Sequence, residues 1–379
     1  MTHAPLDRSL RPQVPLPPFA EGNVLRRCFM RSVPDMDAIE ERRFVIGGRR
    51  LALRSADPAM LDALTRALGH LETLVDQPAQ LTINLWHSAD TDSAPPQPDI
   101  LGEQAPGAFF YWSDERARVG YTLGTSGDAR VLEVYKSVKT PTLSVLDAEA
   151  GEGWYWVQDR DLIPYWEMAT PLRYLLDWWL RDEGLHMLHA GAVGADEGGL
   201  IIVGKSGSGK STTTLSSLAT ELRYAGDDYV GVSIEPQPWV HGLYGSGKLM
   251  PDHVTRLPFL LPAISNPGQL ATEKAVIFVR EHWPTSMTSG FPLRAVVVPR
   301  LVPQLVEARV QRISAMAALA ALAPSTVFQM HTRGKDSLTR MARLVSVVPS
   351  FALDLGSDIA SISKTLSDLV SELNEQAKA

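Results

Sequence analysis

One short stretch constrains the fold of this chain more than any other: residues 204–212, which read GKSGSGKST. They fit the phosphate-binding loop pattern of Gly, four residues, Gly, Lys and then Ser or Thr. Its glycines let backbone N–H groups converge on phosphate oxygens, while the lysine adds a cation and the last hydroxyl faces Mg²⁺. The stretch therefore predicts a site for ATP with Mg²⁺, bound by Gly204, Ser206, Gly207, Ser208, Gly209, Lys210, Ser211 and Thr212.

The sequence on either side of the loop agrees with this interpretation. Residues 199–203 (GLIIV) are a short apolar run typical of a buried strand, and residues 211–219 have the apolar spacing of a helix. Upstream, residues 186–193 predict a second strand and residues 196–199 a tight turn. The strand before the loop is therefore expected to be the second arm of an antiparallel hairpin, unlike the parallel arrangement of doubly wound nucleotide-binding folds.

Asp227 and Asp228 are the second feature that indicates chemistry. Asp227 follows Ser211 by sixteen residues, which leaves room for one helix, a turn and a returning strand beside the loop. Neighbouring strand residues face opposite sides, so one carboxylate can hold Mg²⁺ while the other accepts the proton of an attacking hydroxyl. A Gly-Asp-Asp turn with two exposed acids is the alternative.

Three further residues are candidates for the same site. If the hairpin closes around residues 197–198, His189 lies opposite position 206 inside the loop; a purely structural histidine is the alternative. Lys248 and Arg294 are candidate cations for the phosphoryl group in transfer, and ordinary surface roles are open for both. Residues 245–248 (GSGK) lack the spacing of a second phosphate loop.

The chain divides into four parts. Residues 1–22 are expected to be a proline-rich leader without the apolar segment of a signal peptide. Residues 23–168 predict a strand-rich α+β accessory domain with one helix near 59–74, and residues 169–183 a connecting helix with Thr170 as N-cap. Residues 184–379 hold the loop. The tryptophans near the junction favour packing between domains over a peptide-binding surface.

Composition narrows the partners. A net charge of −7 without a long basic run argues against nucleic acid, and no apolar run has the length of a membrane span. The one cysteine, Cys28, excludes an internal disulfide and fits a reducing compartment. These observations predict a cytoplasmic protein with neither nucleic acid nor membrane as a partner.

Three pieces in this order resemble the catalytic half of the HPr kinase group: the strand bearing His189, the loop at 204–211, and residues 224–230 (YAGDDYV). That group comprises bacterial serine kinases with a phosphoenolpyruvate-carboxykinase-like core. The resemblance implies an α/β P-loop kinase core with a mixed sheet, ATP and Mg²⁺ as cofactors, and a homo-oligomeric assembly. Carried over by position, it implies that Asp227 is the catalytic base, Asp228 a metal ligand with Ser211, and His189 and Lys210 catalytic helpers.

One departure bears on the substrate. HPr kinases carry an acid-containing signature after the Asp pair, whereas residues 239–248 contain no acid. In this the chain is more similar to HPr-kinase-like proteins that phosphorylate a serine of a lasso-peptide precursor, so the acceptor is expected to be a serine of a peptide or small protein. Two alternatives stay open: a nucleotide-gated peptide-binding module, and a kinase for a small-molecule hydroxyl.

Overall fold

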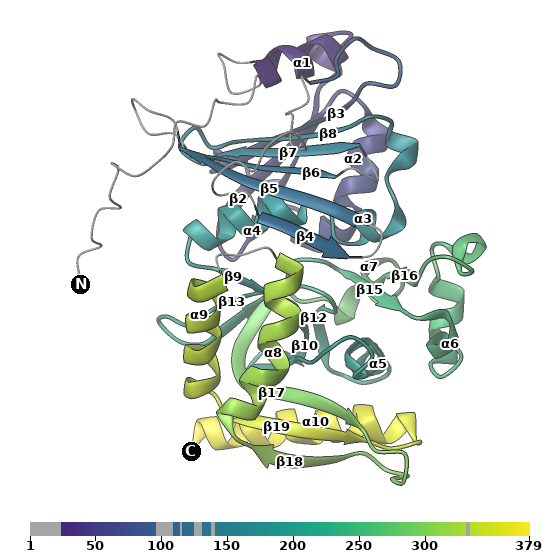
Figure 1. The fold of residues 1–379 in the computed structure, drawn as a ribbon. Coiled ribbons are helices and arrows are strands. Elements are labelled where there is room, and N and C mark those ends of the chain that lie inside the picture. The colour runs from purple at the N-terminus through teal and green to yellow at the C-terminus, as the bar shows by residue number, and fades with distance from the viewer. Residues whose placement is uncertain (1–23, 96–108, 114–115, 125–130, 138–140, 331–333) are drawn as a thin grey trace.

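The computed structural model describes residues 24–95, 109–113, 116–124, 131–137, 141–330 and 334–379. The expected leader and most of the proline- and glycine-rich loop at 95–107 lie outside these ranges. The chain folds into an α/β molecule with two large mixed sheets, one from each half of the sequence (Figure 1). The expected α/β class is confirmed at this level. Within the described ranges, no helix combines the length and apolar character needed to cross a bilayer.

The N-terminal half is built on an eight-stranded sheet with the order β1-β2-β3-β8-β7-β6-β5-β4. Its strands are β1 (Glu40–Ile46), β2 (Arg49–Ser55), β3 (Leu81–His87), β4 (Phe109–Ser113), β5 (Arg116–Gly124), β6 (Val131–Ser137), β7 (Thr142–Asp147) and β8 (Glu152–Val157). Its helices are α1 (Val24–Ser32), α2 (Pro58–Thr65), α3 (Tyr165–Ala169) and α4 (Arg173–Asp182). The expected helix near 59–74 is present as α2 followed by a 3₁₀ turn, Arg66–Leu71.

Helices cover both faces of this sheet. On one face, α1 buries Leu25, Cys28 and Phe29 against aromatic residues of β3 and β8. Within that cluster, Trp86 and Trp154 meet edge to face at a ring separation of 6.3 Å. Trp86, Trp154, Trp156, Trp178 and Trp179 are all buried. Trp178 and Trp179 lie in the hydrophobic cluster that spans both halves, the packing role that the sequence favoured, whereas Trp154 and Trp156 pack against α1 within the N-terminal half.

The C-terminal half carries a nine-stranded mixed sheet whose main path is β12-β10-β11-β17-β14-β13-β9, with β19 and β18 continuing from β17. The strands are β9 (His186–Leu188), β10 (Gly191–Ala195), β11 (Gly198–Ile202), β12 (Arg223–Gly226), β13 (Val230–Ser233), β14 (Trp239–His241), β17 (Gly290–Leu301), β18 (Arg309–Ile313) and β19 (Ser350–Leu355). A separate pair joins β15 (Ser246–Leu249) to β16 (Ala275–Phe278). The helices are α5 (Lys210–Ser216), α6 (Pro251–Val254), α7 (Val279–His282), α8 (Ala315–Met330), α9 (Gly334–Val347) and α10 (Ile359–Lys378).

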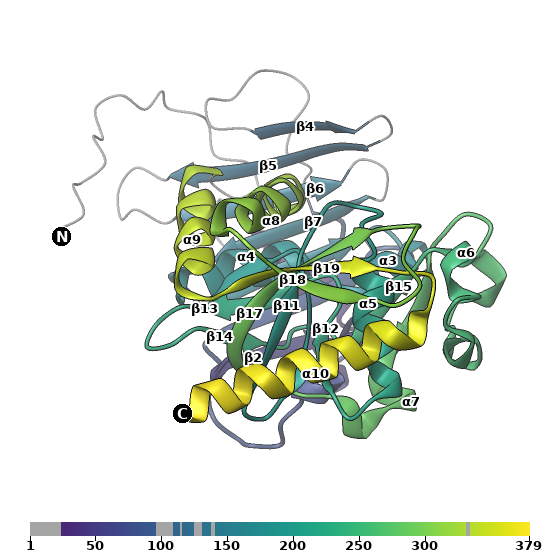
Figure 2. The ribbon, with the colours of Figure 1, turned by 90° about the horizontal axis from the view of Figure 1, so that it is seen from below.

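Alternation along β11 explains the layers around this sheet. Ile201 and Val203 belong to the core under α8 and α9, whereas Leu200 and Ile202 belong to the core under α10. Successive strand residues point to opposite faces, so an all-apolar strand buries both. Figure 2 shows α10 lying along its face of the sheet. The phosphate loop thus follows a strand that is fixed from both sides.

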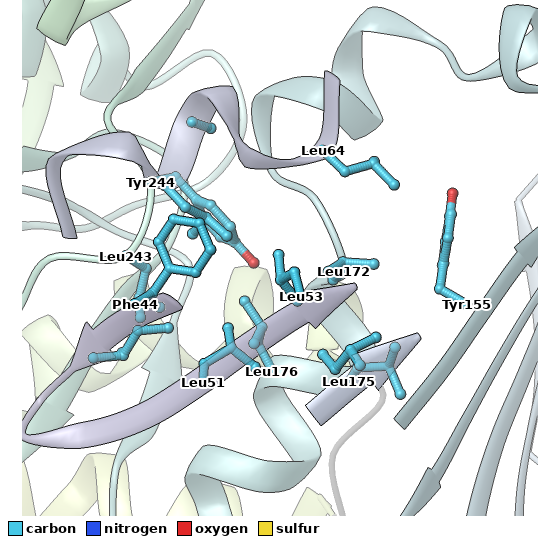
Figure 3. Close-up of a cluster of buried hydrophobic side chains, with 14 of the residues drawn as sticks. Phe44, Leu51, Leu53, Leu64, Tyr155, Leu172, Leu175, Leu176, Leu243 and Tyr244 are labelled. Carbon is cyan, nitrogen blue, oxygen red and sulfur yellow. The ribbon is translucent and has the colours of Figure 1, made fainter. Parts of the chain in front are cut away.

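A hydrophobic cluster joins the two halves. It combines Phe44, Leu51 and Leu53 of the N-terminal sheet with Leu243 and Tyr244 of the C-terminal half, as Figure 3 shows. Leu172, Leu175 and Leu176, at and within the start of α4, lie in the same cluster. Burial of this much apolar surface resists separation of the halves.

Two local predictions were wrong. Residues 186–193 form two strands, β9 and β10, separated by His189 and Ala190. β10 pairs with β11 as expected, but β9 pairs with β13. Thr170 does not cap α4: the N-cap is Leu172, with a φ of 55°, and Thr170 ends α3. The Thr170 hydroxyl has another contact, at the site described next.

Candidate functional site

The phosphate loop occupies the turn between β11 and α5, as its sequence predicted. Gly207 and Gly209 have φ values of 77° and 99°, a region that side chains disfavour. A Cβ at Gly209 would also lie 2.5 Å from Leu355 Cδ1, so a larger residue would have to displace Leu355 besides straining the backbone. The loop backbone is therefore built for close approach to a ligand at the start of α5.

Lys210 lies buried in the first turn of α5. Its ammonium group donates to the carbonyl oxygens of Gly204, at 2.7 Å, and Lys205, at 3.3 Å. Burial lowers the pKa of Lys210, while the charges of Asp227 and Asp228 act in the opposite direction. The cation thus sits inside the curve of the loop, where phosphate oxygens can take over its hydrogen bonds.

Asp227 directly follows the end of β12 and faces the loop. Its Oδ2 accepts a hydrogen bond of 3.1 Å from the Lys248 backbone N–H, and the Ser211 hydroxyl lies close enough to lower its pKa. Burial and the neighbouring Asp228 outweigh both effects and raise the pKa of Asp227 to about 7. Among the described residues, Oδ1 of Asp227 is buried without a hydrogen-bond partner.

Asp228 faces a different set of groups. Lys248 Nζ lies 2.5 Å from its Oδ2, and His189 Nε2 lies 3.8 Å from its Oδ1. Burial works against ionisation of Asp228, but attraction to Lys248 and His189 prevails and holds its pKa well below the usual range. Burial lowers the pKa of His189, so the imidazole is neutral near pH 7. Asp228 is therefore an ionised carboxylate between a cation and a histidine.

The donors beside the loop suit Mg²⁺, which prefers oxygen ligands and keeps several of its waters. The Ser211 hydroxyl lies close to the Asp227 carboxyl, whose Oδ1 has no hydrogen-bond partner among the described residues. In the described part of the chain, no group of three or more His, Cys, Asp or Glu side chains is arranged to hold a metal ion by itself. This donor set fits an ion that is shared with nucleotide phosphates.

Residues of the N-terminal half reach the acid pair through Lys248. Lys248 Nζ is 3.4 Å from Thr170 Oγ1, which accepts from it, and Tyr244 donates a 3.0 Å hydrogen bond to the Pro171 carbonyl. Nearby, Arg173 Nη1 lies 2.6 Å from the Tyr229 hydroxyl, and the Tyr229 ring lies 5.4 Å from the His189 ring. The junction between the halves therefore packs directly behind the site.

The structure brings together most of the predicted residues. Lys210, Ser211, Asp227, Asp228, His189 and Lys248 converge at one end of the sheet. Arg294 does not: it donates to the Glu197 carbonyl at 2.6 Å and to Asn374, at the hairpin turn beyond the far end of β11. That prediction was wrong, because β17 runs parallel to β11 and places Arg294 at the end of β11 away from the loop.

The predicted hairpin is present with a different register. The turn residues are Asp196 and Glu197, and Gly191 pairs with Ile202, so His189 is not opposite position 206. His189 reaches the acid pair because it lies just after the end of β9, outside the strand. There, the His189 backbone N–H donates a hydrogen bond of 3.2 Å to Thr326 Oγ1.

Two contributors were missed. Thr170, predicted to be a helix cap, instead contacts Lys248 with its hydroxyl. Lys274, which precedes β16, lies near enough to lower the pKa of both Lys210 and Asp227. No local pattern in the sequence marks either residue, because each arrives from a distant element.

Comparison with known proteins leaves the family open. No family model matches the chain, and no curated protein does. Among solved structures, the HPr(Ser) kinase/phosphatase from Coxiella burnetii is similar, with a TM-score of 0.29 and 13% sequence identity over 50% of this chain and 98% of that one. Likeness at this level carries no argument about activity, so the proposal below depends on the geometry of the site.

Proposed function

We propose that this protein is an ATP- and Mg²⁺-dependent kinase that transfers the γ-phosphoryl group to a hydroxyl, specifically a serine of a peptide or small protein of the lasso-precursor type. One observation carries the transfer step: an ionised carboxylate, Asp228, lies beside the phosphate loop and is distinct from the carboxylate that faces Ser211. A loop that only binds nucleotide needs the metal-side acid alone.

The contacts favour a division of labour opposite to the one that the resemblance implies. Asp227 lies close to Ser211 and has one carboxylate oxygen without a hydrogen-bond partner among the described residues, which supports a role in holding Mg²⁺. Asp228 contacts His189 and Lys248 and is held ionised at neutral pH, which supports a role as the base that accepts the hydroxyl proton. In this proposal, bound Mg²⁺ would neutralise charge on the phosphates.

Lys210 and Lys248 divide the remaining electrostatic work. Lys210 holds the β- and γ-phosphates from within the loop. Lys248 keeps Asp228 ionised and offers a cation on the acceptor side, where negative charge on the moving phosphoryl group needs stabilisation. Neutral His189 completes the pocket around Asp228 and offers its Nε2 toward that carboxylate.

The test is mass spectrometry of serine-containing peptides after incubation with the full chain, ATP and Mg²⁺. Phosphate on the peptide supports the kinase, and phosphate released only to water contradicts it. Peptide binding that depends on nucleotide but leaves the peptide unmodified would indicate the nucleotide-gated module. Transfer to metabolites but not to peptides would indicate a small-molecule kinase.

A further inference from the structure

A cavity of about 420 Å³ lies at the free edge of β9. Helix α4 forms one wall and helix α9 another, with β9 between them in Figure 1. Its floor combines apolar side chains, Leu188, Val232, Met341 and Leu344, with charged groups around the rim. The loop residues and the acid pair do not line it, so it is separate from the nucleotide site.

The position of β9 suits an extended ligand. β9 ends the main path of its sheet and pairs only with β13 in the described sheet. His186 pairs with Val232 and Leu188 with Val230, so His186, Leu188 and Val232 share one face of the sheet inside the cavity. Free strand edges bind extended peptides by main-chain hydrogen bonds, and neighbouring pockets select alternate side chains.

Arg340 gives the cavity a cationic group with donors to spare. Its Nη1 lies 2.9 Å from Nδ1 and 2.5 Å from Nε2 of His186, and burial lowers the pKa of that histidine to about 4. A neutral imidazole accepts one hydrogen bond, whereas a guanidinium offers five donors. Within the described ranges, no carboxylate lies within 4 Å of Arg340.

The other charged side chains that line the cavity belong to α4 and to the start of α9. Asp182 lies 3.8 Å from Arg181 on α4, and Asp177 is buried in the same helix. Asp336 lines the rim one turn before Arg340 on α9. The guanidinium of Arg340 is therefore the group best placed to bind the carboxylate of a ligand. Arginine and carboxylate groups prefer a bidentate pair with two parallel hydrogen bonds.

The cavity and the transfer site are two parts of one structural unit. His186 and His189 are three residues apart, so at most roughly 10 Å separates their Cα atoms. Helices α8 and α9 also connect the cavity to the transfer site. The Thr326 side chain on α8 accepts a hydrogen bond from the His189 backbone N–H, and α9, which packs beside α8, carries Arg340. About three residues of an extended peptide therefore cover the distance from His186, which contacts Arg340, to His189, which lies near Asp228.

We propose that this cavity is an acceptor subsite: it takes an acidic side chain of an extended peptide, about two to four residues from the phosphorylated hydroxyl, with its carboxylate on Arg340. The proposal rests on the kinase function above and specifies its substrate as an acidic peptide.

The test compares serine peptides of matched length that carry Glu, Gln or Lys at each of the second, third and fourth positions on either side of the serine. The full chain is expected to prefer Glu to Gln at one position by roughly tenfold in kcat/KM, as for a hydrogen bond to a charged group. Arg340→Gln should remove that preference, and Arg340→Glu should shift it toward Lys. Arg343→Gln is the matched control, because Arg343 lies on the same helix but pairs with Glu235 at the surface.

The outcomes separate the two proposals. Equal phosphorylation of Glu, Gln and Lys peptides, or a Glu preference that survives Arg340→Gln, overturns the subsite and leaves the kinase intact. Phosphorylation of no peptide counts against the kinase, and fluorescence anisotropy of the same labelled peptides with the full chain and a non-hydrolysable ATP analogue then decides the subsite. A Glu preference in binding that Arg340→Gln abolishes supports it, and equal binding overturns it.

Discussion

Lys248 and Asp228 form an ion pair whose side chains are only 10% and 13% exposed, which makes its removal a quantitative test of the site. At 2.5 Å and an effective dielectric constant of about 20, the attraction is roughly 6–7 kcal/mol, most of which offsets desolvation. Replacing Lys248 by Met leaves a buried carboxylate with His189 as its nearest partner. We expect the free energy of unfolding to fall by about 3 kcal/mol at pH 7.

The assay is urea denaturation of the parent chain, Lys248→Met, Asp228→Asn and the double variant. Removing both partners should cost less than the sum of the single changes by about 2 kcal/mol, because neither group is left alone. The low pKa of Asp228 stabilises the fold above the ordinary carboxyl pKa, and this contribution is lost as pH falls through the folded value. Lys248→Met should therefore lose less stability on acidification. Additive single changes with unaltered pH dependence would refute the pairing.

Three other changes probe the nucleotide side of the site. Lys210→Ala should remove the thermal shift produced by ATP with Mg²⁺, and a shift of unchanged size would contradict the loop assignment. Because burial raises the pKa of Asp227 to about 7, Mg²⁺ must displace a proton below that pH. The apparent Mg²⁺ dissociation constant should therefore rise about fivefold from pH 7 to 6, and Asp227→Asn should flatten this dependence in a titration. Gly209→Ala forces a Cβ onto Leu355 at a φ of 99°, so we expect a loss of about 1–3 kcal/mol by urea denaturation and weaker ATP binding by calorimetry; wild-type values for both would contradict the loop geometry.

Local patterns predicted the parts of the site that one segment encodes. The loop, the strand before it and the helix after it follow from residues 199–219, because glycine spacing and apolar periodicity act over short range. The acid pair was found for the same reason: it directly follows the next strand, β12.

What the sequence missed depends on tertiary packing. Thr170 contacts Lys248 because a hydrophobic cluster holds the two halves together, and no local pattern reports that arrangement. Arg294 shows the converse: it flanks an apolar strand, but the parallel pairing of β17 with β11 decides which end meets the loop. The register of the β10–β11 hairpin likewise depended on a turn one residue earlier than expected.

The most direct test of the central claim compares Asp228→Asn with Asp227→Asn in transfer and in nucleotide binding. If Asp228 is the base, Asp228→Asn should lower the rate of peptide phosphorylation by about 10²–10⁴-fold and leave the affinity for ATP with Mg²⁺ within a few-fold. Asp227→Asn should weaken Mg²⁺-dependent binding instead. Asp57→Asn, which removes a paired carboxylate from the N-terminal half, controls for general loss of structure. Transfer that persists in Asp228→Asn, at a rate near that of the parent chain, would contradict the account.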